Sequence, residues 1–170
     1  KKLDAVVVTH RHMDHIGGIK AVGEKFAVGK FIGPWAKDKI PTSVMAHAAH
    51  LRKDIGKPAS ARNRPVYETA VTGKVFNFGG GFKMETLWPK VHASGKAIAD
   101  YNEESVAMRV TQSIGKRGAK AASFLVGGDL GVAEERWVAR KMPGKLKVDW
   151  MVANHHGSKG SSQREYMVAA

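Results

Sequence analysis

The strongest constraint on this chain is a group of metal-competent side chains that directly follows an apolar run near its start. Residues 9–18 read Thr-His-Arg-His-Met-Asp-His-Ile-Gly-Gly, and the run Asp4–Val8 precedes them. The apolar run predicts a buried strand over Lys2–Thr9. A strand that ends in this way brings imidazole and carboxylate groups to one point, and zinc, manganese and iron ions accept such ligands.

The spacing inside this group predicts how its side chains divide. His10 and His12 are two residues apart, so on an extended backbone they face the same side. Asp14 and His15 follow where the chain turns into a helix, and they can address a second ion. The alternative is a polar corner without metal, but the clustered imidazoles and carboxylate would then need other partners. The pattern is also rarer by chance than a short glycine motif, which favours the metal site.

Composition indicates an ordinary soluble globular protein with a basic surface. The 170 residues, 43% hydrophobic and 25% charged, suffice for a single domain with its own core, expected over residues 1–170. No apolar stretch approaches the ~18–20 residues of a membrane span. The absence of cysteine excludes disulfides, thiolate metal sites and cysteine nucleophiles. The 28 basic and 15 acidic residues give a net charge of +13, which favours a polyanion such as nucleic acid, anionic polymer or membrane surface.

Strand and helix patterns interleave along the chain. Strands are predicted at Lys2–Thr9, Lys30–Gly33, in a hairpin within Val75–Trp88, and at Val106–Thr111, Ala122–Val126 and Lys147–Ala153. A short helix is predicted after Gly17-Gly18, since Ile16, Ile19, Val22 and Phe26 recur at helical spacing. Further helices are predicted at Ser43–Ile55, Val132–Met142 and Ser162–Val168. This order predicts an α/β or α+β protein with a mixed sheet covered by helices.

Three of the predicted strands end in metal-type residues. Besides the first motif, Asp129 follows Gly127-Gly128, and His155 and His156 follow the last strand. Because function in layered α/β folds gathers in loops at one sheet edge, we expect one shared site. Asp129 taken alone fits a helix cap, but its place between the histidine motifs favours a ligand that bridges two ions. Adjacent side chains diverge, so His155 is favoured as a ligand and His156 either as a support of a ligand or as a contact to substrate.

Polar side chains beside the second histidine pair can bind an anion. Ser158, Lys159, Ser161 and Ser162 offer hydrogen-bond donors to a phosphate oxygen. The alternative is a solvated loop.

The order of these motifs resembles the metallo-β-lactamase superfamily across almost the whole chain. Shorter pieces are similar to the hydrolase domain of ComEC-type competence proteins, which take up DNA, and phosphorylcholine esterases are close in pattern. These pieces are Leu87-Trp88-Pro89, Asn102 to Val106, Leu125 to Asp129 and His155 to Ser158.

The resemblance implies an αββα sandwich with two divalent metal ions at one edge, zinc by default and manganese as the alternative. It assigns His10 and His12 to one ion, Asp14 and His15 to the other, Asp129 to both, and His155 or His156 to the remaining position. The histidine that many members place between the first motif and the bridging aspartate has only His92 as a candidate, and a loop residue is the favoured interpretation there. The first hairpins and the last strand–helix unit of the family have no counterpart, so we expect a fragment, incomplete at both ends. In its full-length form the domain is expected to be exported or attached to a membrane protein.

The resulting hypothesis is a phosphodiesterase or nuclease that cleaves DNA, in particular single-stranded DNA, with a metal-bound hydroxide. Asp14 is expected to orient the nucleophile. The other expected catalytic residues are His156, Ser105, Asn102 and Lys159, with Ser158 and Ser161 as phosphate contacts. The alternatives are a phosphorylcholine esterase or another small-phosphoester hydrolase and, from a different class, an inactive nucleic-acid-binding module. The intact Asp14 and Asp129 argue against the inactive module.

Overall fold

The computed structural model of the chain describes residues 1–35, 66–90, 100–115 and 120–170. They belong to two compact units, which divide between Thr69 and Ala70 and have one sheet each. The predicted helix at 43–55 and His92 lie outside the described residues. The expectation of a single domain over residues 1–170 stays a prediction.

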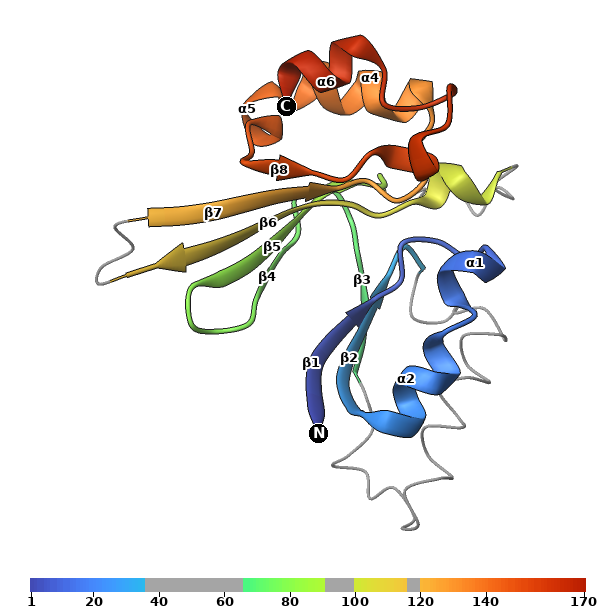
Figure 1. The fold of residues 1–170 in the computed structure, drawn as a ribbon, viewed down its shortest axis with the longest axis vertical. Coiled ribbons are helices and arrows are strands. Elements are labelled where there is room, and N and C mark those ends of the chain that lie inside the picture. The colour runs from blue at the N-terminus through green and yellow to red at the C-terminus, as the bar shows by residue number, and fades with distance from the viewer. Residues whose placement is uncertain (36–65, 91–99, 116–119) are drawn as a thin grey trace. The chain divides into compact units, whose positions relative to one another are not determined.

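The first unit contains a parallel sheet and two short helices that connect its first two strands (Figure 1). Its strands are β1 (Lys2–Val7), β2 (Ala27–Gly33) and β3 (Val66–Thr69), in the order β1-β2-β3. Helices α1 (Met13–Ile16) and α2 (Ile19–Lys25) connect β1 to β2, as parallel neighbours require a crossover. The buried core of this unit consists of Val8, Ile16, Ile19, Val28 and Phe31. The predicted strands at 2–9 and 30–33 are confirmed with shifted ends, whereas β3 was not predicted because its four residues carry no clear alternation.

The helix predicted after Gly17-Gly18 is confirmed as α2, whereas the short helix α1 before these glycines was not predicted. The chain becomes helical at Met13, and the Gly17 N–H ends α1 by donating to the Met13 carbonyl oxygen at 2.7 Å. A Cβ atom at Gly17 would lie 2.7 Å from that same oxygen, so only glycine allows this close turn. Gly18 then precedes α2. The early start places Asp14 and His15 on α1 itself.

The second unit contains a mixed five-stranded sheet in the order β4-β5-β6-β7-β8. The strands are β4 (Val75–Asn77), β5 (Phe82–Trp88), β6 (Ala107–Ile114), β7 (Lys120–Val126) and β8 (Trp150–Met151). Neighbours from β4 to β7 are antiparallel, and β8 runs parallel to β7. The hairpin at 75–88 and the strands at 106–111 and 122–126 are thus confirmed, with ends moved by one to three residues.

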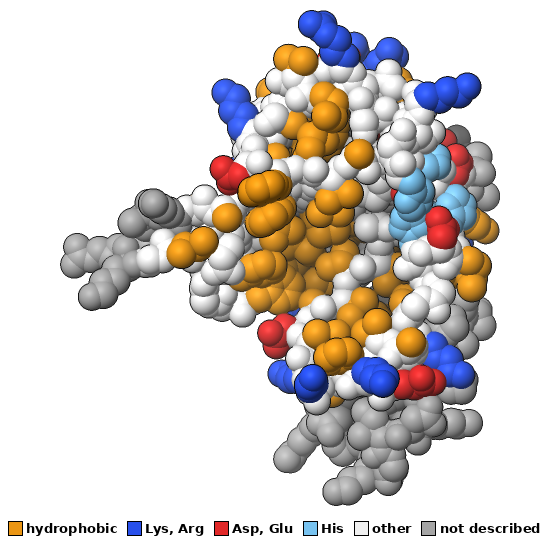
Figure 2. Space-filling view, viewed as in Figure 1, with side chains coloured by type: hydrophobic (Ala, Val, Ile, Leu, Met, Phe, Trp, Pro, Cys, Tyr) orange, Lys and Arg blue, Asp and Glu red, His pale blue; other side chains and the backbone are white. Residues whose placement is uncertain are grey.

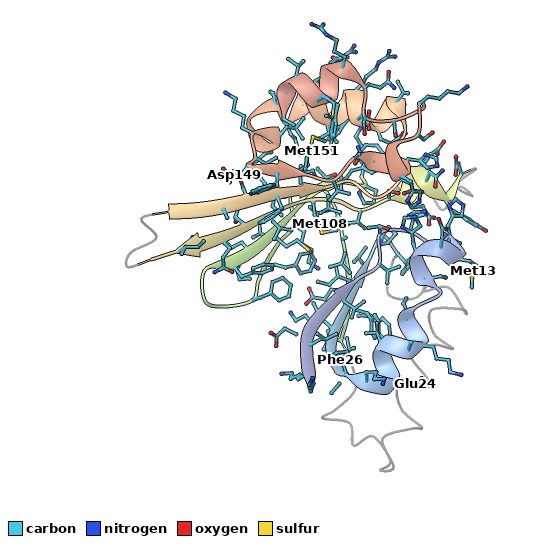
Figure 3. The ribbon with its side chains drawn as sticks, viewed as in Figure 1. Met13, Glu24, Phe26, Met108, Asp149 and Met151 are labelled. Carbon is cyan, nitrogen blue, oxygen red and sulfur yellow. The ribbon has the colours of Figure 1, made fainter. Side chains whose placement is uncertain are left out.

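The last predicted strand, 147–153, is confirmed only over the two residues of β8. Asp149, which lies directly before β8 (Figure 3), explains the late start. Its Oδ2 accepts hydrogen bonds from the Ser123 backbone N–H at 2.8 Å and the Ser123 hydroxyl at 2.7 Å. A side chain therefore takes the place of a backbone acceptor in the ladder, and regular pairing begins one residue later.

Three helices cover one face of the second sheet (Figure 1). They are α4 (Val132–Lys141), α5 (Pro143–Leu146) and α6 (Arg164–Ala169). The predictions at 132–142 and 162–168 are confirmed, and α5 was not predicted. The core between this face and the helices includes Leu87, Leu125, Leu130, Val138, Leu146 and Tyr166. No helix in the described part of the chain is both long and apolar enough to span a bilayer.

The opposite face of this sheet is also apolar. Phe76, Met84, Val110, Phe124 and Trp150 are paired in register across all five strands, one residue from each. Figure 2 shows hydrophobic side chains gathered over these strands. An apolar row on each side of the sheet is typical of a layered fold. The predicted class, α/β with a mixed sheet covered by helices, is confirmed.

Candidate metal centre

The first unit carries its metal-competent side chains on residues 9–16, called the motif loop here, between the end of β1 and the end of α1. The Nε2 atom of His10 lies 3.1 Å from Nδ1 of His12. The Nε2 atom of His15 lies 3.5 Å from Oδ2 of Asp14. Both pairs belong to groups of side chains that can hold a metal ion. The pairing expected from the sequence is therefore present in the geometry of this loop.

These distances fit metal ligation. Two ligand atoms at ~2.0–2.1 Å from one tetrahedral ion lie about 3.3 Å apart. The 3.1 Å between the His10 and His12 nitrogens and the 3.5 Å between the His15 nitrogen and the Asp14 oxygen both lie close to this value. A hydrogen bond between a protonated and an unprotonated nitrogen also gives such a distance. The donor set of imidazoles and one carboxylate, rather than the distance alone, indicates a divalent ion.

Thr9 is a further residue of the motif loop, and the sequence analysis missed it. Its hydroxyl oxygen lies 3.2 Å from Nδ1 of His10 and 3.4 Å from Nδ1 of His15. The rings of His10 and His15 also contact each other, with centroids 4.1 Å apart. A partner at one ring nitrogen fixes the orientation of a histidine and leaves the other nitrogen for a metal. The only signal in the sequence was a hydroxyl residue directly before the first histidine.

The second unit holds its metal-competent side chains at the end of β7 and after β8. Asp129 is buried, 3% exposed, and its Oδ2 lies 3.8 Å from Nε2 of His155 and 3.6 Å from Nε2 of His156. Both rings therefore approach one carboxylate oxygen, although adjacent side chains were expected to diverge. The reason is the backbone, since His155 and His156 have φ values of 49° and 54° in the left-handed region.

Ser105 supports Asp129 through the backbone. The Asp129 N–H donates to the Ser105 hydroxyl oxygen at 3.0 Å, and Ser105 is fully buried. The His155 N–H donates to the Gly128 carbonyl at 3.0 Å and holds the two segments together. Ser105 thus contacts a candidate ligand residue, and this position fits an indirect role better than a contact to substrate.

Asn102 and the serines after the histidine pair differ in what their polar groups contact. The Asn102 side-chain oxygen is buried and has no hydrogen-bond partner among the described residues. The Ser161 hydroxyl donates within its own loop, to the Asn154 carbonyl at 2.7 Å. The Ser158 hydroxyl accepts from the Gly160 N–H at 3.3 Å, and the Lys159 side chain is exposed. Lys159 and the Ser158 hydroxyl can therefore donate to an anion, and the Asn102 oxygen can accept a hydrogen bond, whereas the Ser161 proton is already used.

Tyr166 lies beside this region in the core under α4. Burial raises the pKa of its phenol well above the ordinary value; the nearby Asn154 side chain opposes this rise, and the charge of Glu135 adds to it. The phenol therefore stays neutral and serves packing rather than proton transfer.

The sequence was compared with those of known proteins. A sequence model of the Metallo-beta-lactamase superfamily matches residues 1–108, more than half of the chain. The matched part contains the whole motif loop and ends before β7. No curated protein matches the sequence. The two sheets and several helices described above are consistent with a fold of the metallo-beta-lactamase type.

Proposed function

This chain belongs to the metallo-beta-lactamase superfamily, which implies a metal-dependent hydrolase, and we propose that it cleaves phosphodiesters in DNA. The observation that carries the metal dependence is the pairing inside the motif loop, with 3.1 Å between His10 and His12 nitrogens and 3.5 Å between the Asp14 oxygen and the His15 nitrogen. The choice of DNA depends on charge and on the resemblance to ComEC-type DNA-uptake proteins. In that setting the domain is exported or attached to a membrane protein.

The ligand assignment follows the resemblance to the family. His10 and His12 would hold one divalent ion, Asp14 and His15 would hold a second, and Asp129 would be a ligand of both. His155 completes the set, and its neighbour His156 lies 3.6 Å from the same Asp129 oxygen. Zinc suits these imidazole and carboxylate ligands, and manganese is the alternative. When bound, such ions lower the pKa of water and neutralise charge on a phosphoryl group.

The chain's own residues provide proton transfer and phosphate contacts. The Asp14 side chain is 62% exposed and can orient a water molecule and accept its proton. The His156 side chain is also 62% exposed and can give a proton to the leaving oxygen. The exposed Lys159 is assigned to a phosphate oxygen of the substrate. The Asn102 side-chain oxygen, which has no partner among the described residues, can only accept and is assigned to a proton of the substrate or of a water molecule. Ser105 acts indirectly, by fixing the backbone of Asp129.

The charge of the chain supports a polyanionic substrate. The 28 basic residues exceed the 15 acidic residues by 13. Figure 2 shows Lys and Arg side chains projecting from the helical layer of the second unit. Helices α4, α5 and α6 carry five basic residues: Arg136, Arg140, Lys141, Lys145 and Arg164. Affinity for single-stranded DNA is therefore expected to fall steeply with salt.

A digestion assay tests this proposal. The full chain is incubated with a single-stranded oligonucleotide or a plasmid in zinc or manganese, beside bis-p-nitrophenyl phosphate and p-nitrophenyl phosphorylcholine. We expect metal-dependent cleavage of DNA that Asp14→Ala abolishes. Asp4→Ala is the matched control, since Asp4 is an exposed carboxylate on β1 of the same unit.

The other outcomes separate the alternatives. Turnover of the phosphorylcholine ester alone would indicate an esterase of small substrates. DNA binding without cleavage under any metal would indicate an inactive binding module.

A further inference from the structure

Residues 154–163, called the histidine loop here, follow β8 and lead into α6. Three residues of this loop that are not glycine have a left-handed backbone: His155 with φ 49°, His156 with φ 54° and Ser162 with φ 52°. Residues with a Cβ atom adopt this conformation at a cost, and it persists where the surroundings enforce it. The question is which groups enforce it here.

Glu135 on α4 is the group that contacts both ends of the histidine loop. Its carboxylate is fully buried. Oε1 accepts from the Asn154 side-chain amide at 2.7 Å and from the Ser162 N–H at 2.6 Å, and Oε2 accepts from the Gln163 N–H at 2.8 Å. A buried carboxylate is costly unless its oxygens find donors, and three N–H groups of the loop fill this need. One side chain thus closes the loop at residues 154 and 162–163.

Asn154 connects this closure to the segment that carries Asp129. The Asn154 N–H donates to the Ser162 hydroxyl oxygen at 3.0 Å, and its carbonyl accepts from the Ser161 hydroxyl at 2.7 Å. Its carboxamide packs directly on Gly127 at the end of β7, where an added Cβ atom would overlap it. Asp129 follows two residues later. The loop that presents the histidines is therefore docked against the strand end that presents the carboxylate.

We propose that Glu135 is a positioning residue: through Asn154, Ser162 and Gln163 it holds the backbone in which both histidine rings approach Asp129. The role at a metal centre rests on the function proposed above, whereas the control of the loop does not. Removal of the carboxylate leaves three N–H groups without their acceptor and releases the loop at both ends. The rings of His155 and His156 then lose their fixed distance to Asp129, and metal affinity falls while the fold of the unit persists.

The test compares Glu135→Gln with Glu134→Gln, the same change on the preceding residue of α4. The glutamine at 135 keeps one acceptor oxygen but turns a donor toward the Gln163 N–H. Three quantities are measured on the full chain: the unfolding temperature, the zinc and manganese affinities by chelator competition, and the backbone amide signals of His155 and His156 by NMR without metal. We expect Glu135→Gln to shift both amide signals and to weaken metal binding about 10–100-fold. Glu134→Gln is expected to match the wild type in both.

Each outcome decides the proposal. Unchanged amide signals in Glu135→Gln would overturn it, and so would a lower unfolding temperature with unchanged metal affinity, because that combination describes a purely structural residue. Shifted amide signals and weaker metal binding in a protein that cleaves no phosphodiester would sustain the positioning role and reject the proposed function. If Glu135→Gln fails to fold, Asn154→Ala removes only one of the three contacts, and the same two readouts apply to it.

Discussion

The motif loop of the first unit and the histidine loop of the second unit carry similar side chains but are supported differently. In the motif loop, the histidines contact one another and Thr9, and all of these residues lie within seven positions of the sequence. In the second unit, Asp129 and His155 are 26 positions apart, and they depend on Ser105 and Glu135 from two further segments.

The difference shows two routes to a fixed ligand geometry. Where neighbours in sequence supply the ligands, the strand end and a glycine turn are sufficient to arrange them. Where distant segments supply the ligands, buried polar contacts must fix each segment, because nothing in the local backbone does so. Substitutions should therefore act differently in the two regions, and the following predictions test this contrast.

The largest effect is expected from one carboxylate in each region. Asp14→Asn and Asp129→Asn should each lower kcat/KM for a phosphodiester by more than about 100-fold. Removing a residue that only supports a metal ligand lowers activity about 10–100-fold, and removing the ligand itself should lower it further. Steady-state kinetics in zinc or manganese measures this, with Asp4→Asn as the control. Full activity in either variant would mean that one region suffices alone.

Core substitutions in the two units come next. Ile16→Ala removes a 1% exposed side chain on α1, and Leu125→Ala removes a 1% exposed side chain on β7. Each should destabilise its unit by about 2–5 kcal/mol through lost burial and a residual cavity. Urea unfolding measures this. Ile16→Ala should also weaken metal binding, because Ile16 anchors the helix that carries Asp14 and His15. A change below about 1 kcal/mol in either variant would contradict the assigned core.

Ser105→Ala should have a smaller effect that is confined to the second region. The variant leaves the buried Asp129 N–H without its acceptor, which costs about 1–3 kcal/mol of stability. Metal affinity should fall by about 10-fold or more. Chelator competition measures the affinity, and Ser113→Ala at an exposed position of β6 is the matched control. Equal affinities of both variants would remove Ser105 from the support of the site.

The smallest effect concerns the contact that shortens β8. The pKa of Asp149 lies below the ordinary value of 3.8, and the hydrogen bond from the Ser123 hydroxyl contributes most to this shift. Because the pKa of Asp149 is lower in the folded state than in the unfolded state, the ionised carboxylate stabilises the fold above pH 3.8. This contribution is lost as the pH falls through the folded-state pKa. Ser123→Ala should therefore lower the urea midpoint at neutral pH by more than it does in strong acid. A difference independent of pH would show that the hydroxyl does not act through Asp149.

The contrast between the regions also explains what the sequence could predict. The motif loop could be found because its metal-type residues lie within six positions and follow an apolar run. The short helix α1 could not, because its end depends on one close contact between Gly17 and the Met13 carbonyl. Asp129, His155 and His156 could be named as metal-type residues. Their position after predicted strands favoured one site shared with the first motif, and the resemblance to a known family assigned each residue to an ion.

Of the two supporting residues of the second region, Ser105 was predicted in a different role, and Glu135 carried no signal in the sequence. Glu135 lies in the first turn of α4, where an acidic residue is favoured by the helix dipole and normally solvated. Only the fold shows that it is buried and that it closes a loop some twenty residues further along the chain. The late start of β8 could not be predicted for the same reason. The alternation of apolar and polar residues cannot show that the Asp149 side chain replaces a backbone contact in the sheet.

The proposed function assigns ligands from both regions to one centre with two divalent ions. The direct test is the ratio of metal to protein, by elemental analysis after dialysis, for the wild type, His12→Ala and Asp129→Asn. The account predicts two zinc or manganese ions in the wild type and the loss of at least one ion in each variant, although the variants lie in different units. An Asp129→Asn protein with the same metal content as the wild type would contradict it.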